Sequence, residues 1–352
     1  MNGFVTNYKN VCTGNLGDQP PVMSYYAADE NPVLAFLADK FRICDRWFGS
    51  LPAGTQPSRL MAMSGNSKID VNTKPLPIQP LVYDWLKDRN ISWRVYHEGL
   101  PFFALMLNWL PEILLDDHFR RFPRLEIDLM NTPPKKVPQV LFLEPTYTDA
   151  PTPGPSSDDH PPTAVKGGQA FLFQVYKAFI QVPSLWAETV IIITYDEHGG
   201  FFDHVSPIPL ITNPPEGANY PPFETSGVRV PALVVSPFVE PGTVYKGVLD
   251  HTSILKFIGQ VFGKGGYSSE VDKRPVGSVL DVLNVDNPPD TMPPAPPPLD
   301  DYLNRSIEAV GYVPGKTPYN ELSNGFKDAW DKMQANAAAE TNAKFPDLTG
   351  KF

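Results

Sequence analysis

The sequence predicts an α/β protein built on a doubly wound, mostly parallel sheet. Short apolar runs rich in β-branched residues, such as residues 190–194, are typical of strands that are buried on both faces. These runs alternate with segments of helical periodicity, which is the pattern of a parallel sheet with crossover helices. Polar clusters follow several of the predicted strands, at the edge of an α/β sheet where ligands bind.

The amino-terminal part of the chain begins without a predicted strand. Residues 1–30 are polar and rich in turn-forming residues. Asn31 and Pro32 then provide a cap and a first-turn proline for an amphipathic helix that reaches residue 41. A strand over residues 42–48 follows, and we expect the next helix to begin near Pro57.

The remaining elements continue the alternation up to about residue 261. We predict strands over 91–96, 139–143, 190–194 and 230–237, and helices over 80–90, 102–122, 165–181 and 251–261. The interpretation divides the chain into an α/β domain (1–283), a proline-rich connector (284–300) and a helical extension (301–352).

Composition and charge exclude several classes of protein. The chain has 352 residues, 42% of them hydrophobic and 19% charged, as in an ordered globular protein. A net charge of −10 without a basic run argues against nucleic acid and anionic membranes as partners. Cys12 and Cys44 form no metal-binding spacing; one disulfide between them is an alternative, and two reduced thiols are the simpler interpretation. We expect no transmembrane segment, and no signal peptide in residues 1–20.

The densest chemistry lies directly after the strand at 190–194. Residues 196–204 read Asp-Glu-His-Gly-Gly-Phe-Phe-Asp-His, so that five ionisable side chains occupy nine positions. Carboxylates and imidazoles are metal ligands and proton carriers, and the glycine pair allows a sharp turn. A polar loop is the alternative, but the density favours a metal or acid–base site.

Other candidate residues follow other predicted strands. They are Thr55, His97, Asp159 and His160. Each also has a structural interpretation: Thr55 as a helix cap, His97 as a hydrogen-bonded histidine, and the Asp-His pair as a solvated loop. Their shared position at one edge of the sheet favours the functional interpretation.

Two motifs resemble those of the phosphoesterase family, which includes bacterial phosphatidylcholine-hydrolysing phospholipases C, plant non-specific phospholipases C and a type of acid phosphatase. Residues 54–59 (Gly-Thr-Gln-Pro-Ser-Arg), followed by Ser-Gly-Asn-Ser at 64–67, resemble the nucleophile motif. Residues 195–205 resemble the acidic-glycine motif almost residue for residue. Residues 45–48, 96–98, 159–161 and 250–253 fit in order, so the resemblance covers about 1–265. It implies the alkaline-phosphatase-like α/β/α sandwich.

The resemblance also implies roles for the candidate residues. Thr55 would attack phosphorus and form a phosphothreonine, after ionisation by a metal or a base. Asp196 and Glu197 would bind one divalent metal ion, and Ca, Mn, Mg, Zn and Fe all remain open. His97 and His160 would contact phosphoryl oxygens or protonate the leaving group. Arg59 would pair with phosphate or brace its loop. The side chains assigned to substrate contact or to support of the site are Arg59, Asp159, His198, Asp203 and His204.

One family motif is missing from the sequence. Family members carry Glu-Asn-x-Ser-Phe-Asp on their first strand, where it supplies further metal ligands, whereas this chain starts Met-Asn-Gly-Phe. The Glu30-Asn31 pair opens a predicted helix instead. We therefore expect an amino-terminal truncation that leaves a gap or free edge in the sheet and a metal short of ligands.

The expected function is hydrolysis of phosphate esters, either phospholipase C-type phosphodiesters or phosphomonoesters. The alternative is a catalytically impaired fragment or pseudoenzyme that keeps the fold and a phosphate-ligand site. Family members are often exported, but nothing in this sequence indicates a compartment.

Overall fold

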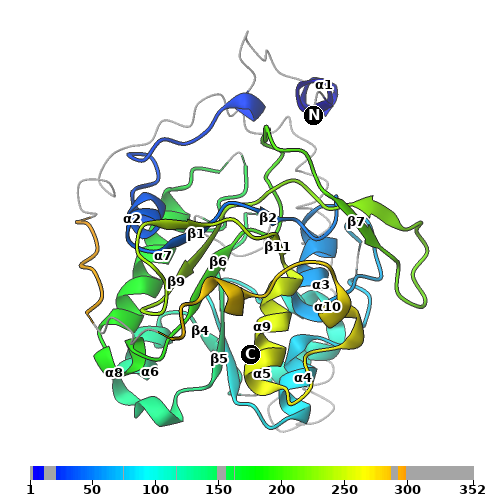
Figure 1. The fold of residues 1–352 in the computed structure, drawn as a ribbon. Coiled ribbons are helices and arrows are strands. Elements are labelled where there is room, and N and C mark those ends of the chain that lie inside the picture. Colours follow the sequence, from blue (N-terminus) through cyan, green and yellow to red (C-terminus); the bar gives the residue numbers. More distant parts are fainter. Residues whose placement is uncertain are drawn as a thin grey trace, which may run out of the picture.

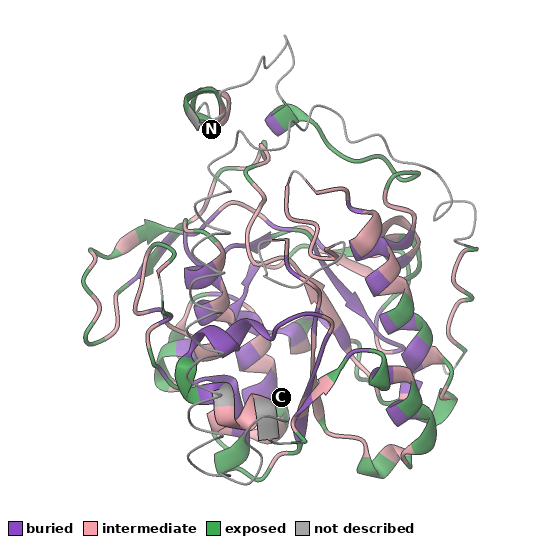
Figure 2. Ribbon diagram, turned by 180° about the vertical axis from the view of Figure 1, so that it is seen from behind, coloured by how far each residue is buried: buried purple, intermediate pink, exposed green. Residues whose placement is uncertain are grey.

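The structure is a computed structural model that describes residues 3–11, 21–73, 75–115, 117–148, 156–161, 163–286 and 292–298. Most of its strands run through the middle of the molecule, with helices packed outside them (Figure 1). Buried residues concentrate on the central strands and on the inward faces of the helices (Figure 2). The prediction of an α/β fold is therefore confirmed.

The largest sheet is mixed and has four strands. Its order is β10 (Thr243–Tyr245), β1 (Arg42–Cys44), β9 (Ala232–Val235) and β6 (Ile191–Thr194). β1 pairs in parallel with β10, whereas β9 is antiparallel to both β1 and β6.

The antiparallel direction of β9 differs from a purely parallel arrangement. No helix lies between β6 and β9 in the described chain, which instead forms the hairpin of β7 (Pro209–Thr212) and β8 (Phe223–Thr225). Antiparallel strands need no helical crossover, which explains the reversal. Outside this sheet, β2 (Trp47–Phe48) pairs in parallel with β11 (Leu249–Asp250). Among the described strands, parallel pairings outnumber antiparallel ones by four to three.

A second sheet is entirely parallel and has three strands. Its order is β4 (Phe119–Arg121), β3 (Trp93–His97) and β5 (Val140–Glu144). Within the described chain, β5 and β6 each pair with one strand only, so each forms an edge of its sheet. The expectation that this chain lacks the first strand of the family stays a prediction.

Most predicted helices are present, with boundaries shifted by one or two residues. They are α2 (Pro32–Lys40), α3 (Thr55–Ser64), α4 (Val82–Asp88), α7 (Lys166–Ile180) and α9 (Thr252–Phe262). The helix expected from Pro57 starts at Thr55. Pro57 is accommodated in its first turn, where a backbone N–H has no partner within the helix.

Two predictions of local structure were wrong. The single helix expected over 102–122 is broken into η2 (Phe102–Leu105), η3 (Leu107–Trp109), α5 (Leu110–Leu115) and the strand β4. Pro111 explains part of this break, since a proline has no N–H to donate inside a helix and is tolerated only in the first turn, where α5 places it. The single strand expected over 42–48 is divided into β1 and β2, which belong to different sheets. The polar, turn-rich amino terminus contains the helix α1 (Gly3–Val11).

The remaining described elements are short. They are η1 (Pro21–Met23), α6 (Arg124–Asn131), η4 (Pro134–Lys136), α8 (Pro183–Trp186), α10 (Ser269–Lys273) and η5 (Val279–Val282). Residues 284–286 and 292–298 of the predicted connector form no helix or strand, and the predicted extension 301–352 lies outside the described residues. None of the described helices is long and apolar enough to cross a membrane.

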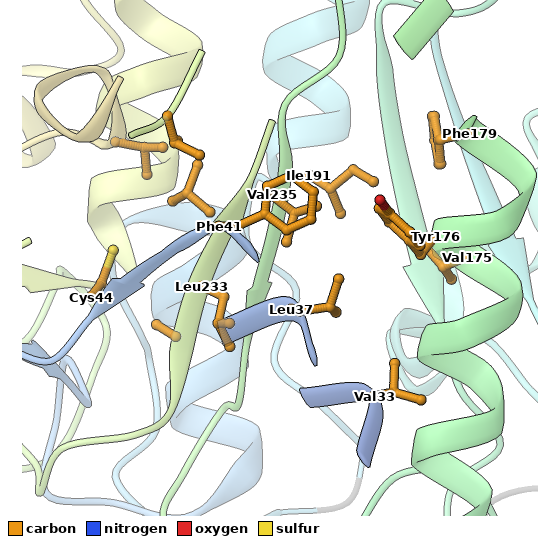
Figure 3. Packing of buried hydrophobic residues seen from close by; sticks show 14 of the residues in the cluster. Val33, Leu37, Phe41, Cys44, Val175, Tyr176, Phe179, Ile191, Leu233 and Val235 are labelled. Atoms are coloured by element: carbon orange, nitrogen blue, oxygen red, sulfur yellow. The ribbon is translucent and has the colours of Figure 1, made fainter. Parts of the chain in front are cut away.

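Two apolar clusters hold the elements that carry the site. In the first, Leu37 from α2 and Val175 from α7 face Ile191 of β6 and Leu233 of β9 (Figure 3). The second surrounds the stacked rings of Tyr83 and Trp93 and includes side chains of α3 and α9. Full burial of such a side chain stabilises the fold by about 1.5–3 kcal/mol. Both β6 and α3 are thus anchored in the interior.

Candidate active site

A pocket of about 570 Å³ lies where the predicted site residues converge. It is lined by segments that are distant in the sequence, including the start of α3 and the loop after β6. Eight of the ten predicted site residues line it: Thr55, Arg59, Asp159, His160, Asp196, Glu197, His198 and Asp203.

His97 and His204 are not among the lining residues. His97 is buried at the end of β3, and its Nδ1 lies 2.6 Å from the carbonyl oxygen of Gly99. Burial lowers the pKa of this imidazole. The His204 side chain is 81% exposed, and its Nδ1 lies 3.5 Å from an oxygen of Asp203. The structure therefore places both histidines outside the pocket lining, although His204 contacts Asp203.

Thr55 is the first residue of α3 and is half-buried at the pocket wall. Asn72 fixes the start of the helix, because its Oδ1 accepts a hydrogen bond of 3.1 Å from the backbone N–H of Gln56. Gln56 in turn accepts a bond of 2.6 Å from the N–H of Thr73. Thr55 and Arg59 are four residues apart, so they lie on the same face of α3.

Arg59 connects α3 to the loop after β6. Its Nε donates to Asp196 Oδ2 at 2.9 Å, and its Nη1 donates to the Tyr147 hydroxyl at 2.7 Å. The guanidinium lies 4.5 Å from the ring centre of Phe102 and 4.6 Å from that of Tyr147, in the range of cation–π attraction. Of the two predicted roles of Arg59, the structure contains the brace to the acidic loop.

The acidic loop turns back on itself directly after Asp196 and Glu197. Glu197 Oε2 accepts a bond of 2.8 Å from the N–H of Gly199. Gly199 and Gly200 have φ values of 65° and 77°, a conformation that favours glycine. Burial raises the pKa of Glu197, and the neighbouring charge of Asp196 raises it further.

The predicted metal site can be tested against this geometry. Within the described chain, no group of three or more His, Cys, Asp or Glu side chains could hold a metal ion. Asp196 uses one oxygen for Arg59 and the other for the N–H of Glu197. The described residues therefore do not fit a divalent metal by themselves.

Asp159 and Asp203 lie in contrasting environments within the pocket. Asp159 accepts a hydrogen bond of 2.6 Å from the Tyr195 hydroxyl and has a left-handed φ of 55°. Burial raises the pKa of Asp159 to about 6. Asp203 is also partly buried, but bonds of 2.7 and 2.8 Å from Arg229 outweigh the effect of burial and lower its pKa.

His160 has a defined tautomer. Its Nδ1 lies 2.8 Å from the carbonyl oxygen of Pro161, which can only accept a hydrogen bond. Nδ1 therefore carries the proton in the neutral ring, and the lone pair is on Nε2. The imidazole is thus arranged to accept a proton at Nε2.

Sequence reasoning missed four residues that shape the pocket: Asn72, Tyr147, Tyr195 and Arg229. Tyr195 belongs to the acidic-glycine motif and so had a signal in the sequence. Tyr147 lies in the loop after β5, and Arg229 precedes β9, where their sequence neighbours indicate no partner. Only the folded chain brings Tyr147 to Arg59 and Arg229 to Asp203.

Comparisons with known proteins agree with the motifs. The model of the phosphoesterase family matches residues 1–264. Non-specific phospholipase C3 of Arabidopsis thaliana is 32% identical over 320 residues, which cover 84% of this chain and 59% of that protein. Phospholipase C B of Mycobacterium tuberculosis (strain ATCC 25618 / H37Rv) is 29% identical over 285 residues, covering 70% and 53%. This chain thus spans little more than half the length of either relative.

Similarity to solved structures is more distant. A protein in the alkaline phosphatase superfamily from Vibrio parahaemolyticus has a TM-score of 0.43 and 13% identity, over 71% of this chain and 64% of that one. The structure described as Ps i-CgsB has a TM-score of 0.43 and 14% identity, over 70% and 69%.

Proposed function

Because this chain belongs to the phosphoesterase family, we propose that it hydrolyses phosphate esters, with phospholipids as the substrate class and Thr55 as the nucleophile. The observation that carries the proposal is the position of Thr55. It opens helix α3 in the wall of the pocket, one turn from Arg59, whose guanidinium contacts the acidic loop.

In the proposed reaction the Thr55 oxygen attacks phosphorus while the bond to the leaving ester oxygen breaks. The hydroxyl proton passes to a base in the pocket, and the leaving oxygen takes up a proton as the alcohol departs. Water then hydrolyses the phosphothreonine, which releases the phosphorylated product and restores the hydroxyl.

Two pocket residues are suited to carry these protons. Glu197 has a raised pKa, so its carboxylate is a better base at neutral pH than an exposed glutamate. His160 holds its lone pair on Nε2 in the neutral ring. We propose Glu197 and His160 as the proton carriers of the reaction.

Two positive features of the pocket would attract the phosphoryl oxygens. The first is the amino-terminal end of the ten-residue helix α3, where backbone N–H groups produce a partial positive charge of about half a unit. The second is the Arg59 guanidinium. The ion pair with Asp196 holds the guanidinium in place and partly neutralises its charge. A bound phosphate would therefore share the positive charge of Arg59 with the Asp196 carboxylate.

The same ion pair supports a second candidate function, a non-catalytic member of the family that binds a phosphorylated ligand. Within the described chain, Asp196 is engaged by Arg59 and no set of three potential metal ligands comes together. If the reaction depends on the predicted divalent metal, this chain alone would be catalytically impaired.

The deciding experiment compares Thr55→Ala with Thr55→Ser and with Thr225→Ala, a control at an exposed position on β8. Hydrolysis of p-nitrophenyl phosphate, p-nitrophenylphosphorylcholine and phosphatidylcholine is measured with and without added divalent metal. We expect Thr55→Ala to lower kcat by about 10³-fold or more, and Thr55→Ser to keep part of the activity. Hydrolysis that survives Thr55→Ala would exclude Thr55 as the nucleophile.

Calorimetric titration with Ca²⁺, Mn²⁺, Mg²⁺ and Zn²⁺ separates the two candidates. Binding that is lost in Asp196→Asn, together with metal-dependent turnover, supports the metalloenzyme. Phosphate binding without turnover at any metal concentration supports the non-catalytic protein.

A further inference from the structure

His251 is a buried histidine outside the pocket, at the position just before α9. Only 1% of the residue is exposed. Its ring contacts the backbones of two other segments: Nδ1 lies 3.3 Å from the N–H nitrogen of Ser50, and Nε2 lies 2.9 Å from the carbonyl oxygen of Tyr195.

These two contacts determine the state of the ring. The Ser50 N–H can only donate a hydrogen bond, so Nδ1 must accept it through its lone pair. The Tyr195 carbonyl can only accept, so Nε2 must carry the proton. The neutral ring with its proton on Nε2 satisfies both contacts, and no other form of the imidazole does.

The two contacted segments are those that carry the proposed chemistry. Ser50 lies five residues before Thr55, in the segment that leads into α3. Tyr195 directly precedes Asp196 in the loop after β6. The His251 ring therefore connects the nucleophile segment to the acidic segment from a position outside the pocket lining.

A buried ion pair supports the same segment from its other side. Arg274 Nη2 donates to the Ser50 carbonyl at 2.8 Å, and Arg274 Nε donates to Asp250 Oδ2 at 2.6 Å. The Asp250 side chain is 0% exposed. The N–H and the carbonyl of Ser50 are thus both held by side chains.

The neighbouring residue Gly49 is held by backbone bonds. Its N–H donates to the Val228 carbonyl at 2.9 Å, and its carbonyl accepts a bond of 2.8 Å from Gly227. A Cβ atom at Gly227 would lie 2.4 Å from the Leu51 carbonyl oxygen, so this close approach requires glycine. These backbone bonds hold the segment before Thr55 against residues 227–228, which precede β9. His251 connects this segment to the acidic loop.

We propose that His251 is a positioning residue, which sets the relative position of Thr55 and the Asp196–Glu197 loop by holding the backbones of Ser50 and Tyr195. It does not line the pocket, so it acts through these segments and not on the substrate. This inference rests on the proposed function for its catalytic consequence. The geometric link itself can be tested without turnover.

Three substitutions separate the two contacts. His251→Asn keeps an acceptor near the Nδ1 position for the Ser50 N–H, and His251→Gln keeps a donor that can reach the Tyr195 carbonyl. His251→Phe keeps the ring volume and loses both contacts. Tyr96→Phe is the matched control, because it removes a buried hydrogen bond of 3.0 Å to Asp128, away from the pocket.

The kinetic readout is kcat and KM per folded molecule, at a temperature where circular dichroism shows each variant to be folded. We expect His251→Phe to lower kcat by about 10²-fold with KM changed less than about twofold, since misplacement by about 1 Å has effects of this size. His251→Asn and His251→Gln should retain intermediate kcat values, and Tyr96→Phe should match the wild type. A kcat of His251→Phe equal to that of Tyr96→Phe would overturn the proposal.

Hydrogen exchange provides the readout that does not need activity. Peptides covering residues 49–54 and 195–200 should exchange faster in His251→Phe than in the wild type, and at unchanged rates in Tyr96→Phe. If the wild type hydrolyses none of the three esters, the proposed function fails while this measurement still tests the link. Unchanged exchange in both peptides would show that His251 does not hold the two segments.

Discussion

The pocket and the buried network of Asp250, His251 and Arg274 each contain an Arg–Asp ion pair, and the two pairs differ in their exposure to solvent. In the pocket, Arg59 and Asp196 form an ion pair whose side chains are 22% and 24% exposed. In the buried network, Arg274 and Asp250 form an ion pair whose side chains are 8% and 0% exposed. The first pair is open to water and to a ligand, whereas the second is fully enclosed.

The difference indicates a division of work between the two regions. A guanidinium that must interact with an incoming phosphoryl group has to be accessible and able to share its charge. A guanidinium that holds a backbone segment has to keep all its partners, as Arg274 does with Asp250, Ser50 and Thr212. Substitutions in the two regions should therefore affect different quantities.

The largest effect is expected on stability in the buried network. Arg274→Met leaves Asp250 buried without its partner, and loss of one member of such a pair costs about 3–5 kcal/mol. Urea unfolding measures the loss. Arg94→Met is the control, because its partner Asp117 is 67% exposed and such a pair contributes less than about 1 kcal/mol. Equal losses in the two variants would contradict the contrast.

A smaller effect, on activity, is expected in the pocket. Arg59→Met should lower kcat/KM by about 10²-fold, because it removes the phosphoryl contact and leaves Asp196 without its ion pair. Arg59→Lys should retain little of the wild-type kcat/KM, since an ammonium cannot bond to both Asp196 and Tyr147 in the fork geometry of the guanidinium. Steady-state kinetics on p-nitrophenyl phosphate checks this, and full activity of Arg59→Lys would show that only its charge matters.

The smallest effect is a difference in pH dependence between a half-buried aspartate of the pocket, Asp159, and the fully buried Asp250. Burial raises the pKa of Asp159 from 3.8 to about 6, so the folded state binds this proton more tightly than the unfolded chain. The contribution of Asp159 to stability must therefore decrease as pH rises from about 4 to 6. In Asp159→Asn this decrease should be absent, as judged by urea unfolding at several pH values.

Asp250 should behave in the opposite sense. Although burial acts to raise its pKa, Arg274 and Thr252 outweigh burial and the pKa is lowered. The contribution of Asp250 to stability is present above the unfolded pKa and is lost as pH falls through the lower folded value.

A wild type whose stability has the same pH dependence as Asp159→Asn between pH 4 and 6 would contradict the raised pKa of Asp159.

The sequence by itself determined the elements and the motifs. The helix α7 and the strands β5 and β6 were predictable within one or two residues, because apolar periodicity is a property of neighbouring residues. Eight of the ten predicted site residues do line one pocket, since the carboxyl ends of strands tend to meet at one edge of an α/β sheet.

Only the tertiary structure decided the direction of β9 and the partners of the charged residues. Arg59 and Asp196 are 137 residues apart, and Ser50 and His251 are 201 apart. Nothing in either local sequence indicates these pairs, because a hydrogen bond depends on positions set by the path of the whole chain. For the same reason, the sequence indicated His251 only as part of the family motif at 250–253. Its contacts with the backbones of Ser50 and Tyr195 could be identified only in the folded protein.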